Sequence, residues 1–118
     1  MQVSIIIRAY NSERVIKRAV ESALNQGFPR KDFEVIVVND GSTDKTLAIL
    51  KNYGKKIWLI NQKNQGAIPA ANRGLRASRG KYVILLDDDD YFAKDILKQM
   101  IAAFNKNSQI DFVYCDYY

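Results

Sequence analysis

The sequence predicts an α/β fold with a mostly parallel, doubly wound sheet of about five strands and helices on both faces. Short β-branched runs alternate with amphipathic, helix-like stretches along the whole chain. The run at residues 33–39 is apolar almost throughout, as expected for a strand that is covered on both faces. The 118 residues, 47% of them hydrophobic, are enough for one core. We therefore expect a single domain over residues 1–118, with right-handed crossovers.

Each element has its own signal. Residues 3–8 form a β-branched run that predicts the first strand. Apolar residues then recur on one helical face between Val15 and Leu24, with Ser12 as the expected N-cap and Gly27 after the end. The same reasoning predicts strands at 33–39, 57–61, 81–86 and 112–117, and helices that open near residues 42–44, 69 and 96.

Composition narrows the possible chemistry. The chain has no histidine and one cysteine, so histidine-based catalysis and zinc sites of His or Cys are excluded. Its net charge of +5 comes from scattered Lys and Arg without interleaved aromatic residues, and we expect no nucleic-acid partner. The longest apolar runs are far shorter than the ~20 residues of a membrane span. The chain starts directly with a strand-like run, so we expect no signal peptide. We expect a cytoplasmic location, and a position at the cytoplasmic face of the membrane is an open alternative.

Polar residues gather where the expected strands end. In an open parallel sheet, ligands bind outside the carboxyl ends of the strands. The segments at these ends are residues 9–11, 40–42, 64–66 and 87–90. A ligand site is therefore expected along this edge of the sheet.

Four consecutive aspartates, residues 87–90, are the strongest feature. Adjacent carboxylates repel one another, so a bound cation would relieve them. Oxygen ligands without His or Cys favour Mg²⁺ or Mn²⁺. The alternative is a solvated loop in which one aspartate caps the next helix, and Asp90 in particular is expected to be only structural.

Two other positions stay open on residue chemistry alone. Asp40 either builds a turn and helix cap or accepts hydrogen bonds from a base or ribose. Tyr10 either stacks on a base or covers the rim of the core. The segment at 64–66 most often forms a tight turn. No glycine-rich phosphate loop or dinucleotide fingerprint is present.

Taken together and in order, these segments resemble the donor-binding half of family 2 glycosyltransferases, which have the GT-A fold. The motifs that carry the resemblance are VSIIIRAYN (3–11), IVVNDGSTD (36–44), NQG (64–66) with ANRG (71–74), and LDDDD (86–90). The chain departs from the family at Arg8, where proline is usual, and at Asn39, where aspartate is common.

The resemblance implies roles for individual residues. Ala9, Tyr10 and Asp40, with Gly66, would hold the nucleoside of a UDP- or GDP-sugar. The segment at 87–89 would match the family's D-x-D motif: Asp87 and Asp89 would hold Mn²⁺ or Mg²⁺ at the diphosphate, and Asp88 would lie at the ribose and at the waters of the metal.

The implied reaction is an inverting transfer of the sugar to a hydroxyl of a glycan or lipid acceptor. The acceptor-binding part and its catalytic base are expected to lie outside this chain, so the catalytic residue is unknown. The alternative is a catalytically silent nucleotide-binding module that needs a partner chain or self-associates. A phospho-receiver domain fits the length, but its acids would follow strands one and three, whereas here they follow strands two and four.

Overall fold

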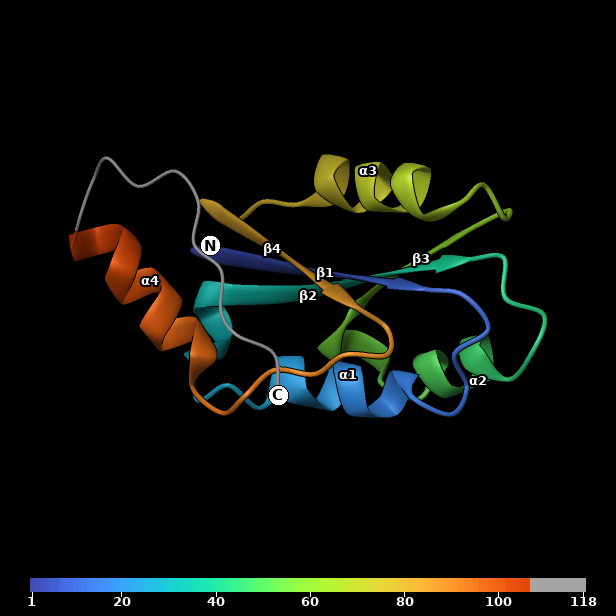
Figure 1. Cartoon of the computed structure of the whole chain (residues 1–118), viewed down its shortest axis with the longest axis horizontal. Helices are drawn as coiled ribbons and strands as arrows, with labels where there is room; N and C mark the ends of the chain where they lie inside the picture. Colours follow the sequence, from blue (N-terminus) through green and yellow to red (C-terminus); the bar gives the residue numbers. More distant parts are fainter. Residues whose placement is uncertain (107–118) are drawn as a thin grey trace.

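A parallel four-stranded sheet forms the middle layer of the domain (Figure 1). The computed structural model describes residues 1–106. The strand order is β3-β2-β1-β4 and all neighbours pair in parallel. The strands are β1 (Val3–Ala9), β2 (Phe33–Asp40), β3 (Trp58–Gln62) and β4 (Tyr82–Asp87).

Helices cover both faces of this sheet. Helix α3 (Ala67–Ala77) forms one outer layer by itself, and α1 (Ile16–Leu24) and α2 (Thr46–Lys51) form the other (Figure 1). Helix α4 (Ile96–Lys106) lies at one end of the molecule (Figure 1). Short 3₁₀ turns at Arg30–Asp32 (η1) and Gly54–Lys56 (η2) lead into β2 and β3.

The core has two parts because successive strand residues point to opposite faces. Ile5 and Ile7 of β1 are fully buried in the cluster on the α1 and α4 side. Ile6 lies between them in sequence and packs under α3 with Ala70. Both faces of the central strands are therefore apolar, as the uninterrupted apolar runs predicted.

The structure confirms the predicted fold class and moves the strand bounds by only one residue. The predicted cap at Ser12 is wrong: α1 starts later, at Ile16, and the buried Ser12 hydroxyl has no hydrogen-bond partner among residues 1–106. The backbone N–H of Ser12 instead donates to the Thr46 hydroxyl, which draws this residue towards α2. The strand predicted at residues 112–117 lies outside the described residues.

Strand β4 is only partly covered on its α3 side. Val83 and Leu85, which point to the α3 side, are 38% and 53% exposed, whereas Leu86 on the other side is buried. Helix α3 packs over β1 and β2 and leaves this part of β4 open.

Within residues 1–106, no helix is both long and apolar enough to span a bilayer.

Candidate functional site

The carboxyl edge of the sheet places four polar side chains on one face. Residues at alternate positions of each strand point to the α3 side, as Ile6, Ile36 and Ile60 do. Continuing this alternation to the strand ends brings Gln62, Asp40, Arg8 and Asp87 to the same face, in the order of the strands β3, β2, β1 and β4.

This polar row borders a hollow of about 390 Å³ between the sheet edge and the first turn of α3. The residues to which the family resemblance gives a binding role all line it: Ala9, Tyr10, Asp40, Gly66, Asp87, Asp88 and Asp89. Four further residues complete its wall: Arg8, Asn64, Ala67 and Ala70.

Asp40 holds the loop that leads into α3. It is 4% exposed, and its Oδ1 accepts hydrogen bonds from the Gln62 side chain and the Gln65 backbone N–H, both at 2.8 Å. Its Oδ2 accepts from the Gly66 N–H at 3.0 Å and from the Asn64 side chain at 3.3 Å. Burial by itself raises the pKa of Asp40, but these hydrogen bonds outweigh it and leave the pKa below its ordinary value of 3.8.

Two glycines make this loop geometry possible. Gly66 has φ +103°, which side-chain-bearing residues rarely adopt, and it directly precedes α3. Gly41 has φ +72°, and a Cβ there would lie 2.5 Å from the backbone nitrogen of Asn64. The loop after β2 and the loop after β3 therefore touch, backbone against backbone, beside Asp40.

A second network joins the loop after β1 to the loop after β2. The Asn11 side-chain oxygen accepts from the Thr43 backbone N–H at 2.7 Å, and the Asn11 N–H donates to the Ser42 hydroxyl at 3.0 Å. Ser42 in turn donates to Asn39 at 2.6 Å. Asn11 adopts a left-handed conformation, φ +46°, which asparagine tolerates better than most residues. These motif residues build the scaffold of the site, a role that the sequence did not distinguish from ligand contact.

The acidic loop after β4 brings three carboxylates together. Asp87, Asp89 and Asp90 each offer an oxygen within 4.8 Å of the others. Burial, followed by the charges of Asp89 and Asp87, raises the pKa of Asp90 above its ordinary value of 3.8. Asp88 points elsewhere and accepts the backbone N–H of Tyr10 at 3.1 Å. Asp90, which the sequence assigned a structural role only, therefore joins the possible ligand set.

Two arginines contact this acidic loop from different elements. Arg8 lies directly across from Asp87 in the β1–β4 register, and its guanidinium forms an ion pair with Oδ1 of that carboxylate. Arg18 of α1 donates to the backbone oxygen of Asp89 at 3.0 Å and lies over the ring of Tyr91. The loop is therefore held by cations on both sides of the sheet edge.

The carboxylates fit a hard divalent cation. They supply only oxygen. Burial, followed by repulsion from Asp89 and Asp87, raises the pKa of Asp90, and a cation would relieve that repulsion. The hollow thus has an acidic end that suits a metal ion and a neutral end, around Tyr10 and Gly66, with an aromatic ring and backbone groups.

The chain has a parallel α/β sheet with a polar hollow at its carboxyl edge. The solved structures that it resembles have the same kind of sheet, which is called the GT-A fold. The profile described as "Glycosyl transferase family 2" matches residues 4–118. The chain belongs to this family.

Relatives of known sequence agree with this assignment. An uncharacterized glycosyltransferase of Rickettsia prowazekii is 40% identical over 116 residues, which cover 98% of this chain and 36% of that protein. A chondroitin synthase of Escherichia coli is 42% identical over 115 residues, 95% of this chain and 16% of the relative. The chain therefore spans about a third or less of the length of these curated relatives.

Solved structures show the same fold with ligands bound. Residues 1–349 of TarS from S. aureus, in complex with UDP-GlcNAc, match with a TM-score of 0.81 and 37% identity over 90% of this chain and 32% of theirs. The mannosyltransferase PcManGT from Pyrobaculum calidifontis, in complex with GDP-Man and Mn²⁺, matches with a TM-score of 0.78 and 26% identity over 87% of this chain and 32% of its own.

Proposed function

We propose that this domain binds the nucleoside diphosphate part of a nucleotide-sugar and presents the sugar for transfer to an acceptor hydroxyl. The observation that carries the proposal is a hollow at the carboxyl edge that is acidic at one end and aromatic at the other. Structural neighbours solved with UDP, UDP-GlcNAc and GDP-Man support a UDP- or GDP-sugar as the donor.

At the neutral end, the ring of Tyr10, 48% exposed, stacks on the base. Ala9 is buried, so it borders this end through its backbone. Asp40 already accepts four hydrogen bonds, the number that a carboxylate takes readily. A base N–H reaches Asp40 by replacing its longest bond, the one from Asn64 at 3.3 Å.

At the acidic end, Asp87 and Asp89 hold a Mn²⁺ or Mg²⁺ ion, and Asp90 contributes a third carboxylate to the cluster. When bound, the ion supplies positive charge to the departing diphosphate. Asp88 stays on the Tyr10 backbone and keeps the β1 loop beside the ribose. Arg8 offers its remaining N–H groups to the phosphate oxygens.

The transfer itself is an inverting, single displacement. The acceptor oxygen bonds to the anomeric carbon while the bond from that carbon to the diphosphate oxygen breaks, and a base removes the acceptor proton. Among the described residues that line the hollow, the carboxylates are the saturated Asp40 and those of the acidic loop. We therefore assign the base and the acceptor site to sequence outside the described residues, in keeping with the chain's coverage of about a third of its relatives.

Calorimetric titration of the chain with UDP and with GDP, each with and without Mn²⁺, tests this proposal. We expect metal-dependent binding of one nucleotide, lost in Asp89→Asn and kept in Asp32→Asn, which removes a carboxylate near the opposite end of β2. Equal binding with and without Mn²⁺ would contradict the metal assignment.

A further inference from the structure

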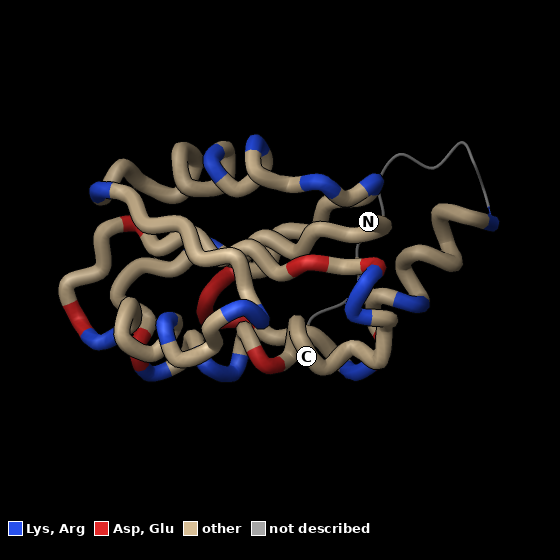
Figure 2. The backbone as a smooth tube through the Cα atoms, turned by 180° about the vertical axis from the view of Figure 1, so that it is seen from behind, with Lys and Arg blue, Asp and Glu red and all other residues tan. Residues whose placement is uncertain are grey.

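The Lys and Arg residues are scattered along the chain, but one continuous stretch has no acidic residue to balance them. Residues 45–86 contain nine Lys and Arg and no Asp or Glu, although the whole chain has 13 acids. The other residues, with nine cations and 13 acids, are net acidic. The stretch forms α2, η2, β3, α3 and most of β4. Along α3 and the segment after it, every charged position in Figure 2 is a Lys or Arg.

Part of this stretch lines a second hollow, of about 400 Å³, at the amino ends of the strands. It lies at the end of the sheet opposite the proposed donor site, about 20 Å away at the rise of a β-strand. Its charged and aromatic wall includes six residues: Arg30, Glu34, Lys55, Lys56, Trp58 and Arg79.

The only carboxylate of this wall, that of Glu34, already accepts hydrogen bonds from neighbouring residues. Glu34, 8% exposed, accepts hydrogen bonds from the Ser4 hydroxyl at 2.6 Å and from the Arg79 backbone at 2.8 Å. Its other oxygen accepts from the Arg79 guanidinium at 3.0 Å. The guanidinium of Arg30 is also fixed, because it donates to the Lys56 carbonyl at 3.1 Å.

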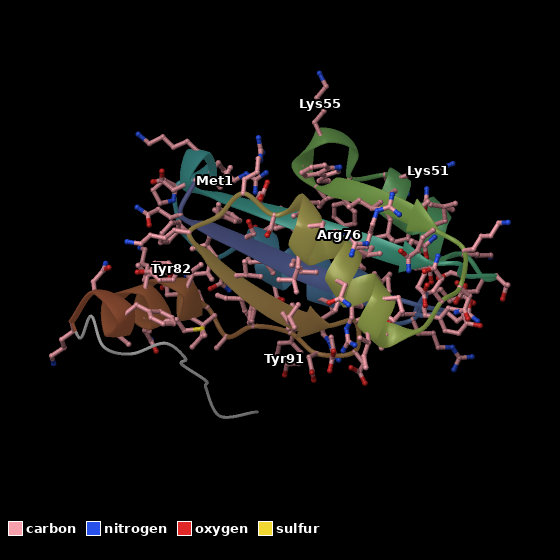
Figure 3. All side chains as sticks on the ribbon, turned by 90° about the horizontal axis from the view of Figure 1, so that it is seen from above. Met1, Lys51, Lys55, Arg76, Tyr82 and Tyr91 are labelled. Atoms are coloured by element: carbon pink, nitrogen blue, oxygen red, sulfur yellow. The ribbon has the colours of Figure 1, made fainter. Side chains whose placement is uncertain are left out.

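The two lysines of the wall remain available. Lys55 and Lys56 are exposed and form no ion pair with any residue of the range 1–106. Figure 3 shows Lys55 extending away from the domain at the β3 edge, with Arg76 on the neighbouring helix α3. The hollow therefore has two fixed guanidinium groups, one of them neutralised, and two free ammonium groups.

Apolar side chains are exposed among these cations. Trp58, the only tryptophan, is 44% exposed, and the Arg79 guanidinium lies 5.9 Å from its ring. On α3, Ile68 and Leu75 are 75% and 43% exposed, while Ala70 and Gly74 face the sheet. A soluble polyanion would contact the cations but gain nothing from exposed aliphatic side chains. A bilayer interface favours both, since indole rings and aliphatic groups partition there.

We propose that the α3 layer and the β3 edge dock on an anionic lipid bilayer, with a lipid phosphate in the hollow beside Lys55 and Lys56. Each Lys or Arg near an anionic bilayer strengthens binding by about fivefold. With the α3 layer lying on the bilayer, the proposed donor site, which is bordered by the first turn of the same helix, opens beside the membrane surface.

The test uses Trp58 as a built-in probe. We expect its fluorescence to shift to the blue, and the protein to float with the vesicles, when phosphatidylglycerol is mixed into phosphatidylcholine vesicles but not with phosphatidylcholine alone. The double substitution Lys55→Glu/Lys56→Glu should weaken this binding at least about tenfold. Arg14→Glu/Lys17→Glu makes the same charge change at exposed positions in and before α1 and should retain it, with circular dichroism verifying folding of both.

Three results would overturn the proposal. The first is no flotation of the folded chain with anionic vesicles. The second is an equal loss in both double variants, which would mean that net charge rather than this surface decides binding. The third is a saturable Trp58 shift of the same size with inorganic phosphate or a single-stranded oligonucleotide and no vesicles, which would assign the hollow to a soluble anion.

Discussion

At the scale of single residues, the ion pair between Arg8 and Asp87 competes with the binding of a cation at the site. Asp87 belongs to the carboxylate cluster, and its Oδ1 is already paired with the Arg8 guanidinium. A cation must therefore compete with Arg8 until phosphate oxygens give the guanidinium another partner. This arrangement predicts that metal and diphosphate strengthen each other's binding.

Arg8→Ala should bind Mn²⁺ alone more tightly, by up to about fivefold, because exposed ion pairs contribute about 0.2–1 kcal/mol. The same substitution should reduce the gain in Mn²⁺ affinity that UDP or GDP produces. Titration of free Mn²⁺ by electron paramagnetic resonance measures both values. Arg76→Ala removes the same charge from α3 and should change neither; an unchanged Arg8→Ala would show that the ion pair does not compete with the metal.

Asp40 and Glu34 link stability to pH. Hydrogen bonds hold both pKa values below the ordinary 3.8 and 4.5, despite the opposing effect of burial. Groups with a lowered pKa in the folded state stabilise it above their unfolded pKa, and this contribution is lost as the pH falls through the folded pKa. We therefore expect the free energy of unfolding to decrease as the pH falls below about 4.5.

Urea unfolding at neutral and acidic pH measures this dependence. Asp40→Asn should cost about 1–3 kcal/mol at neutral pH, since an amide would face N–H groups that need an acceptor. Its loss of stability on acidification should be smaller than that of the unchanged chain. Equal pH dependence in the two proteins would mean that Asp40 does not titrate with unfolding.

At the scale of elements, the strands could be predicted closely and the loops could not. The bounds of β1 and β2 followed from buried β-branched runs, a signal carried by the strand itself. Ser12 failed as a cap because its surroundings are set by Thr46, more than thirty residues away. Asp40 and Asp90 show the same limit. The sequence places both aspartates at strand ends, but it does not show which groups they contact. Asp40 is hydrogen-bonded by the loop after β3, and Asp90 lies beside the other carboxylates of the acidic loop.

The packing of α3 on the sheet depends on one small residue. A Cβ at Gly74 would lie 2.5 Å from Cγ2 of Ile6, which is fully buried. Gly74→Ala should therefore lower the free energy of unfolding by about 1–3 kcal/mol, although alanine favours a helix. Asn72→Ala on the exposed side of α3 serves as the control and should change stability by about 0.5 kcal/mol or less. A stable Gly74→Ala would show that α3 can move away from β1 without cost.

At the scale of the whole molecule, the open side of β4 predicts self-association. Val83 and Leu85 are exposed on the same face, and β4 is an edge of the described sheet. The weight-average mass in sedimentation equilibrium should rise with concentration, and Val83→Lys/Leu85→Lys should abolish the rise. A monomer at all concentrations would show that this face needs no partner in the isolated chain.

The central claim is that a cation and a nucleotide meet in the hollow at the carboxyl edge. Paramagnetic Mn²⁺ broadens the nuclear magnetic resonance signals of nearby groups, so it reports the place of binding directly. With UDP or GDP present, we expect the amide signals of Asp88, Asp89 and Asp90 to broaden first and those of Tyr10 and Gly66 next, while the Trp58 indole signal at the other end stays sharp. Broadening that begins at Trp58, or that is uniform over the chain, would contradict the assignment of the site.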